Sequence, residues 1–502
     1  MIDYDAFWSA ISLLSGDPMA WLVVVPGIII GLVFGSVPGL SISIAMAVFL
    51  PATLYMDFLP AILFLTAIFT GGGFGGAIPA ILMNIPGTSA AVATAFDGYP
   101  MSQQGKHGEA LGIGLVASVV GTFIGYAFLI VIVDSVADLV LRLGPTEMLV
   151  IATWGLLLIA ILNDSTFAKG LAAGALGLLV STVGYSNTGM MRGTFDSFYL
   201  LDGIPAIPAL IGLFAAAELF GLAGRDYIIR DADLRRVRMS SILKGVVFAL
   251  RQPLAILRGS AIGTMIGIVP GVGASVANLA SYAIARRKTP ERFGKGEPLG
   301  VIASESANSS SEGGGMVTLL ALGIPGGAGT AILLGAFAMH NVAGGPRFIA
   351  EQTDVVYALI LGNMAQTLVL MIVGLGFIFL SGYIVRTPLR FLIPIVIAIS
   401  MMGAFALTGS MVGPLTVAGA GALGWLMKRY RYPVTATVVG LLVGGLAEGE
   451  LVRSWQISGG DPTFVLERPI TLALLAIMAV SMLPALIRWA RRRSGPKTET
   501  AK

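Results

Sequence analysis

Two Pro-Gly motifs in this chain are each followed by small polar side chains. Thr88 and Ser89 come directly after Pro86-Gly87, and Thr330 follows Pro325-Gly326-Gly327. Proline lacks a backbone donor and glycine tolerates unusual dihedrals, so such a pair ends one helix and lets the next begin. The free N–H groups at a helix N-terminus attract anions. We therefore expect an anion site built from the following residues: Asn84, Pro86, Gly87, Thr88, Ser89, Pro325, Gly326, Gly327 and Thr330.

A polar run lies upstream of the second motif. It extends from Ser304 to Glu312 and ends at Gly313-Gly314-Gly315, whereas the first motif has Thr70 before Gly71-Gly72-Gly73. Carbonyl groups of unwound chain, together with Ser, Thr and Asn oxygens, are the ligands that a hard cation such as sodium prefers. We expect sodium, as the coupling ion, to be held by these residues: Asn308, Ser309, Ser310 and Glu312.

Other interpretations of these residues remain open. The hydroxyls of Thr88, Ser89 and Thr330 could merely cap buried helices, and Ser309 to Glu312 could form a solvent-exposed loop. A proton-coupled carrier would depend instead on one titrating carboxylate inside the membrane. The candidates for such a carboxylate are Asp97, Asp164 and Glu312. Both histidines of the chain are expected to be structural.

The chain lacks the residues that several other functional classes require. It has no cysteine, which removes disulfides, thiolate metal sites and cysteine nucleophiles. None of the patterns HExxH, GxSxG or GxxxxGK[ST] occurs, so zinc proteases, nucleophile-elbow hydrolases and P-loop ATPases are excluded. The formal charge of +4 comes from 31 cations and 27 acids and gives no signature of nucleic-acid binding. We expect no enzyme activity, no cofactor and transport driven by an ion gradient.

The elements that must position these residues are membrane helices. Of the 502 residues 56% are hydrophobic and only 12% are charged, against about 25% charged in a typical globular domain. The mean hydropathy is +0.88. We predict an all-α polytopic membrane protein with about ten to twelve membrane segments, since about 20 apolar residues cross the bilayer. The clearest windows are Gly108–Val133, Glu147–Leu162, Phe167–Val183, Ile204–Leu222, Asp354–Ile384, Phe391–Leu407, Met411–Met427, Val434–Leu446 and Pro469–Trp489.

Two motifs recur in the same order along the chain. The pattern GxxxGxVPG begins at Gly31 and again at Gly263, and a Gly-Gly pair followed by Ile-Pro-Gly begins at Gly75 and again at Gly314. The first copy of these motifs is flanked by acidic residues without a cation, and the second by basic loops. Opposite flanks predict two inverted repeats with broken helices, an architecture of secondary transporters. The residues expected to act as hinges at the breaks are Pro38, Gly39, Pro270 and Gly271.

The distribution of Lys and Arg predicts orientation and division of the chain. Cytoplasmic loops retain these cations, so we expect the basic segments and the C-terminus to be cytoplasmic. The first cation is Lys106, which argues against a cleaved signal peptide at the N-terminus. We expect repeat 1 with flanking scaffold helices over 1–224, a basic linker over 225–258, repeat 2 with scaffold helices over 259–490 and a tail over 491–502. An anion channel, independent of ion gradients, or a solitary permease is the alternative function.

Several segments together resemble the large membrane subunit of the tripartite tricarboxylate transporters. They are GLVFGSVPGL from Gly31, TGGGFGGAIPAILMNIPGTSAAVATAFDGYP from Thr70, GTMIGIVPGVGASVA from Gly263, ASESANSSSEGGGMVTLLALGIPGG from Ala303 and LLVGGLAEGELVRS ending at Ser454. The resemblance covers nearly the whole chain, from Gly31 to about Arg488.

This resemblance implies a permease of the bacterial inner membrane that takes up citrate and related tri- or dicarboxylates, generally with sodium. It implies two partners, a small four-helix membrane subunit and a periplasmic solute-binding protein. It also implies a fold similar to elevator-type carriers, with a re-entrant hairpin in each inverted repeat. Neither Pro-Gly motif contains an arginine, so the motifs do not identify the carboxylate.

Overall fold

A computed structural model describes residues 3–494, with gaps at 38–39, 163–166, 187, 223–237, 288, 385–388 and 462. The predicted hinge residues Pro38 and Gly39 and the candidate carboxylate Asp164 lie outside the described residues, as do part of the basic linker and most of the C-terminal tail. The chain divides into two compact units, 1–141 with 205–426, and 142–204 with 427–502.

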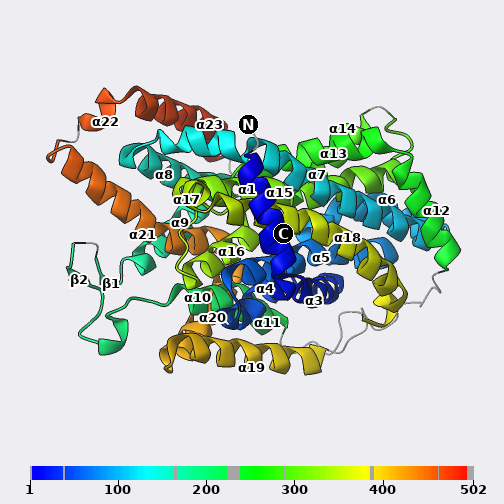
Figure 1. Cartoon of the computed structure of the whole chain (residues 1–502), viewed down its shortest axis with the longest axis horizontal. Helices are drawn as coiled ribbons and strands as arrows, with labels where there is room; N and C mark the ends of the chain where they lie inside the picture. Colours follow the sequence, from blue (N-terminus) through cyan, green and yellow to red (C-terminus); the bar gives the residue numbers. More distant parts are fainter. Residues whose placement is uncertain are drawn as a thin grey trace. The chain divides into compact units, whose positions relative to one another are not determined.

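The first unit contains both Pro-Gly motifs and is built from helices (Figure 1). Its first part comprises α1 (Tyr4–Gly16), α2 (Pro18–Leu22), α3 (Val24–Ser36), α4 (Ile42–Phe49), η1 (Leu50–Tyr55), α5 (Phe58–Met83), η2 (Ser89–Ala91), α6 (Val92–Gln103) and α7 (His107–Leu141). Its second part comprises α10 (Ala206–Ile211), the π-helical turn η4 (Gly212–Ala216), α11 (Ala217–Leu222), α12 (Met239–Leu250), α13 (Pro253–Gly267), α14 (Gly273–Arg286), α15 (Pro298–Leu322), α16 (Ala328–Met339), α17 (Pro346–Glu351), α18 (Thr353–Ile384), α19 (Leu389–Thr408) and most of α20 (Val412–Arg429).

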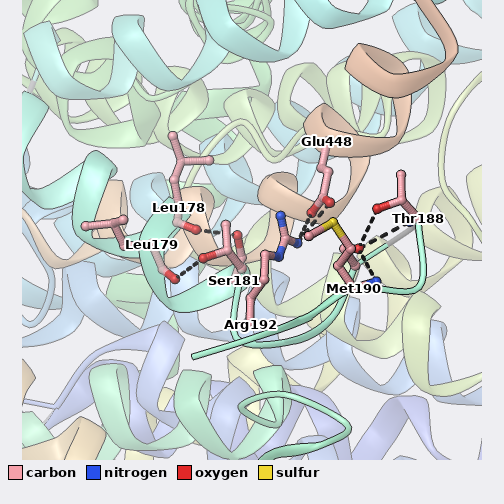
Figure 2. Close-up of polar contacts among 9 residues, drawn as sticks. Leu178, Leu179, Ser181, Thr188, Met190, Arg192 and Glu448 are labelled. Atoms are coloured by element: carbon pink, nitrogen blue, oxygen red, sulfur yellow. Dashed lines mark hydrogen bonds and ion pairs between the residues drawn. The ribbon is translucent and has the colours of Figure 1, made fainter. Parts of the chain in front are cut away.

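The second unit is also mainly helical. It comprises α8 (Pro145–Leu162), α9 (Phe167–Ser181), the short strands β1 (Gly184–Tyr185) and β2 (Met191–Arg192), η3 (Phe198–Leu200), α21 (Val434–Ile457), α22 (Phe464–Glu467) and α23 (Pro469–Ser494). Figure 2 shows how the hairpin of β1 and β2 is tied to α21: Arg192 and Glu448 point toward each other, with Arg192 Nη2 2.8 Å from Glu448 Oε2. Glu448 of this ion pair lies in the last segment that carried the family resemblance.

The all-α polytopic class is confirmed. Every one of the nine apolar windows is helical, and five helices among the described residues are long and apolar enough to cross a membrane. A sixth candidate is the pair α12 and α13, which is bent by 76°. Residues 239–258, assigned to the basic linker from the sequence, form these helices, and Gly245 of α12 packs on the Glu109 carbonyl of α7.

The glycine clusters do not interrupt their helices, contrary to the unwound backbone expected from the sequence. Both α5 and α15 run continuously, over 26 and 25 residues, through Gly71-Gly72-Gly73 and Gly313-Gly314-Gly315. The glycines serve close packing instead: a Cβ at Gly71 would lie 2.4 Å from the Ile28 carbonyl oxygen, and one at Gly313 would lie 2.4 Å from the Gly125 carbonyl carbon. The main-chain carbonyls of the polar run therefore accept hydrogen bonds within helix α15.

The true breaks come at the ends of these two helices, and they are alike. Asn84 ends α5 with φ 59° and Gly323 ends α15 with φ 66°. In both places the next N–H reaches back six residues, from Ile85 to the Pro79 carbonyl and from Ile324 to the Thr318 carbonyl, at 3.4 Å. A left-handed residue with this bond is a common helix terminator. The Pro-Gly turn then leads into the second arm, α6 or α16.

The two copies of GxxxGxVPG pack in the same register. A Cβ at Gly35 of α3 would lie 2.6 Å from the Gly72 carbonyl oxygen of α5, and one at Gly267 of α13 would lie 2.4 Å from the Ser311 carbonyl oxygen of α15. Helix α3 therefore lies against α5 as α13 lies against α15 (Figure 1). Only glycine allows so close an approach of two backbones.

Helices that follow the two copies of the motifs also contact each other. Helix α4 of the first copy packs on α16 of the second, and α14 of the second packs on α6 of the first. Asn278 of α14 joins three elements, because its Oδ1 accepts from the Ala93 N–H of α6 at 2.9 Å and its Nδ2 donates to the Ser304 carbonyl of α15 at 3.2 Å. Each Pro-Gly turn is thereby brought next to a helix start from the other copy.

Candidate functional site

A cavity of about 210 Å³ lies where the two copies meet. The first copy contributes Thr88 and Ser89 to its wall, and the second contributes Gly326, Gly327 and Thr330. The starts of α4 and α14 and one face of α15 contribute Ser41, Ile42, Ser43, Gly273, Ala274, Ser275, Ser311, Glu312 and Gly315. The apolar residues Phe69, Ala90, Gly267, Ala328 and Gly329 complete the wall. The structure therefore brings together five of the nine residues expected to form the anion site.

Helix N-termini surround this cavity. Helices α4, α14 and α16 begin at its lining residues, and η2 leads directly from Thr88 into α6. Each N-terminus presents free N–H groups and about half a positive elementary charge. Among the described residues that line the cavity, none is a Lys, Arg or His. An anion bound here would be held by helix ends and hydroxyls without a basic side chain.

The hydroxyls of the first motif are placed differently from that of the second. Thr88 Oγ1 is buried and has no hydrogen-bond partner among the described residues, so it does not cap η2. The Ser275 hydroxyl of α14 donates to Ser89 Oγ at 2.8 Å, across the two copies. Thr330 does act as a cap, because its Oγ1 accepts from the Gly327 N–H at 2.8 Å. Of these hydroxyls, that of Thr88 is the one without a partner among the described residues.

The remaining predicted residues shape the turns behind the wall. Asn84 is the left-handed terminator of α5, and neither Pro86 nor Pro325 is among the lining residues. Gly87 is packed tightly, since a Cβ there would lie 2.1 Å from the Gly35 carbonyl oxygen. The Pro270-Gly271 turn is adjacent, because the Gly271 N–H donates to the Gly326 carbonyl at 2.8 Å.

The four residues expected to hold sodium do not form one cluster. Asn308 Nδ2 donates to the Gly73 carbonyl at 3.3 Å, and Ser310 Oγ donates to the Ser260 carbonyl at 2.9 Å. Glu312 instead lines the cavity. The alternative of a solvent-exposed loop is wrong, because the run is a buried part of α15.

Glu312 is held by hydroxyl groups from the first copy and from α7. Thr70 Oγ1 lies 2.9 and 3.0 Å from the two carboxylate oxygens, and the Tyr126 hydroxyl donates to Oε1 at 2.9 Å. The side chain is almost fully buried, and its described hydrogen-bond partners include no cation. A carboxylate buried in this way is costly unless its charge is balanced.

Sequence reasoning missed three side chains around the site. Glu305 lies two turns before Glu312 on α15, is fully buried and accepts from Thr94 and from Ser118, the latter at 3.1 Å. Gln366 of α18 donates to Thr70 Oγ1 at 3.3 Å. Tyr126 is the third. The spacing of seven residues between Glu305 and Glu312 was visible in the polar run. Nothing near Tyr126 or Gln366 in the sequence indicated that these side chains contact Glu312 and Thr70.

Asp97, a candidate for proton coupling, has a structural position. Its Oδ1 accepts three backbone N–H groups, from Gly294, Gly296 and Glu297, at 2.8 to 3.0 Å. Its Oδ2 accepts from the Tyr282 hydroxyl at 2.8 Å. The carboxylate thus ties α6 of the first copy to the basic insert of the second, by which we mean the loop between α14 and α15. Within the described part of the chain no group of three or more His, Asp or Glu side chains could hold a metal ion.

Comparison with known proteins gives the context for this arrangement. Residues 21–439 match the model of the tripartite tricarboxylate transporter TctA family. An uncharacterized 52.8 kDa protein in the TAR-I ttuC' 3' region of Agrobacterium vitis is 30% identical over 467 residues, which are 92% of each chain. An uncharacterized protein in the TAR-II ttuC' 3' region of the same organism is 30% identical over 227 residues, 45% of this chain and 94% of its own. No solved structure matches the chain significantly.

The family match covers both Pro-Gly motifs and every residue of the cavity wall. The large subunit of a tripartite transporter works with partner subunits, and its family is one of transporters and not of enzymes. This multi-pass membrane protein belongs to the tripartite tricarboxylate transporter TctA family.

Proposed function

We propose that the chain is the permease subunit of a secondary transporter that takes up tri- or dicarboxylates with sodium across the bacterial inner membrane. The observation that carries this proposal is the cavity between the two copies, where several helix N-termini converge without a basic side chain among the described lining residues. Such ends bind carboxylates in transporters with broken helices.

The size and chemistry of the cavity suit a small carboxylate. Its volume of about 210 Å³ is below the roughly 300 Å³ at which pockets for drug-sized ligands begin. Two helix ends together offset about one elementary charge. The unpartnered Thr88 hydroxyl supplies a donor at the same wall. A ligand with two or three carboxylates would meet hydrogen-bond donors on more than one side of the cavity.

The proposal includes the partners and the orientation of the complex. A periplasmic solute-binding protein delivers the carboxylate, and a small four-helix membrane subunit completes the transporter, as the family relationship suggests. The C-terminus is cytoplasmic, because its cations follow the positive-inside rule. Alternating access by an elevator-type movement is part of the same proposal.

A substitution at Gly327 tests the cavity directly. A Cβ at Gly327 would meet nothing within 4 Å, although the residue lines the cavity. Gly327→Val should therefore place an apolar side chain in the cavity, with open space around its Cβ. We expect uptake of labelled citrate into proteoliposomes with the partner subunits to fall at least about tenfold, which corresponds to about 1.4 kcal/mol.

A matched control exists on α18, where a Cβ at Gly376 also meets nothing within 4 Å. Gly376→Val should leave citrate uptake close to that of the unaltered permease. Normal uptake by Gly327→Val, in protein that reaches the membrane in normal amount, would place the carboxylate site elsewhere. Loss of uptake in both variants would show that valine acts through the fold.

A further inference from the structure

A buried polar cluster adjoins the wall of the cavity. Thr70 of α5 and Tyr126 of α7 donate to Glu312, and Gln366 of α18 donates through Nε2 to Thr70 Oγ1 at 3.3 Å. Asn363, one turn earlier on α18, accepts from Gln366 Nε2. All five side chains are at least 95% buried. We name these five residues the Glu312 cluster.

One acceptor of this cluster is without a partner. Gln366 Oε1 is buried and makes no hydrogen bond among the described residues, although both bonds of its amide nitrogen are satisfied within the cluster. Buried polar atoms nearly always have a partner, so an orphan of this kind indicates a group that belongs beside it. Since the atom is a carbonyl oxygen, its missing partner is a donor or a cation.

The charge of the cluster favours a cation. Glu312 carries the cluster's one carboxylate, and no Lys, Arg or His is among its described hydrogen-bond partners. The same side chain lines the cavity in which we place an anionic substrate. Two negative charges side by side in a water-poor interior repel each other strongly. A positive charge must reach the cluster before or together with the substrate.

The oxygen atoms available in the cluster match one kind of cation. They are the Glu312 carboxylate, the hydroxyls of Thr70 and Tyr126, and the amide oxygens of Asn363 and Gln366. Hard cations are bound by several such oxygens. A single formal negative charge among neutral oxygens suits a monovalent ion better than a divalent one.

We propose that the coupling sodium ion binds in the Glu312 cluster, with Gln366 Oε1 and a Glu312 oxygen among its ligands. Its arrival neutralises the wall of the cavity and permits a carboxylate to enter. The site replaces the run Asn308 to Ser310 as the sodium site. Its coupling role rests on the proposed function, whereas the binding of sodium can be tested without any substrate.

The neighbouring glutamate of α15 serves as an internal comparison. Glu305 is as buried as Glu312 and is also held by hydroxyls, from Thr94 and Ser118. No orphan acceptor accompanies it among the described residues, and it does not line the cavity. Glu305→Gln is therefore a matched control for the removal of a buried negative charge from the same helix.

The experiment measures the melting temperature of the purified full-length permease in detergent, in sodium chloride against choline chloride at constant ionic strength. We expect sodium to raise the melting temperature of the unaltered protein without any carboxylate present. Gln366→Met should raise the half-saturating sodium concentration about tenfold or more, since the partner of a charge is lost. Glu305→Gln should keep the unaltered value.

A second arm adds citrate as the probe for the cavity. Citrate should stabilise the unaltered permease only when sodium is present, whereas Glu312→Gln should respond to citrate without sodium and show no response to sodium. If citrate has no effect in any variant while the sodium response depends on Gln366 and Glu312, the sodium site stands and the substrate class is wrong.

Two results would overturn the sodium site. In the first, the melting temperature of the unaltered permease does not change with sodium, but its increase with citrate becomes larger as the pH falls. That result would make the proton the coupling ion. The other is a sodium response that survives in Gln366→Met and disappears in Ser310→Ala. That result would return the ion to the upstream run.

Discussion

At the scale of single residues, the same side-chain type has opposite roles in this protein. Asp97 accepts four hydrogen bonds and holds two segments together. Glu312 has two hydroxyl donors among the described residues and faces a cavity. A carboxylate whose acceptor capacity is used by backbone N–H groups is a structural anchor. A buried carboxylate with an unmet charge is a candidate for function.

Substitutions at Asp97 separate these roles. Asp97→Ala leaves the N–H groups of Gly294, Gly296 and Glu297 without their acceptor. Gly294 is exposed and its N–H can turn to water, whereas Glu297 is buried. We therefore expect the free energy of unfolding to fall by about 1–3 kcal/mol, the cost of leaving a buried group unpaired. Asp97→Asn keeps one acceptor oxygen and should cost less. Thermal melting of the purified permease checks whether Asp97→Ala is less stable than Asp97→Asn.

Transport by Asp97→Asn supplies the contrasting outcome. If Asp97 only joins α6 to the insert, citrate accumulation should persist in Asp97→Asn with its ion dependence unchanged. Loss of accumulation with unaltered melting temperature would identify Asp97 as a coupling carboxylate.

At the scale of elements, glycine positions set how closely the helices approach. The pairs α3 with α5 and α13 with α15 each meet through a GxxxG face, where a side chain would collide with a neighbouring carbonyl. This close approach places the Pro-Gly turns beside each other, because the turns follow directly on the packed helices. The positions of the helix ends around the cavity therefore depend on close packing at glycines one to two turns away.

Alanine at equivalent glycines tests this symmetry. Gly35→Ala and Gly267→Ala would each bring a Cβ within 2.6 Å of a carbonyl oxygen on the partner helix. We expect both to lower the free energy of unfolding by about 1–3 kcal/mol, the usual cost of overpacking. Gly376→Ala, whose Cβ meets nothing, should be neutral or stabilising. Equal melting temperatures for all three variants would contradict the packing argument.

At the scale of the whole molecule, the two copies within the first unit act as one functional body. The cavity takes its wall from both, and the Glu312 cluster joins Thr70 of the first copy to Glu312 of the second, 242 residues apart. Neither copy contains a complete site. An inverted arrangement would let the same cavity be presented to either side of the membrane by related movements.

Labelling of single cysteines tests the inversion. The chain has no native cysteine, and Asp57 and Glu291 are both exposed in loops that precede the two hairpin helices α5 and α15. We expect Asp57→Cys to react with a membrane-impermeant reagent from the periplasmic side and Glu291→Cys only after the membrane is opened. Reaction of both from the same side would show that the copies are parallel.

The sequence alone predicted the helical class, identified the duplicated motifs and named five residues that line the cavity. These features depend on local composition and on residues adjacent in the chain. The continuity of α5 and α15 through their glycines could not be predicted, because glycine breaks a helix or allows close packing according to what lies beside it.

Only the tertiary structure decided which polar groups meet. The sodium prediction chose residues close together along α15, but neighbouring positions of a helix point in different directions. Asn308 therefore donates to Gly73 and Ser310 to Ser260, whereas Glu312 accepts from Thr70. The partners of Glu312 lie on α5 and α7, and Gln366 lies on α18. Sequence spacing determines which face of a helix a residue occupies. Which helix covers that face depends on the packing of the whole unit.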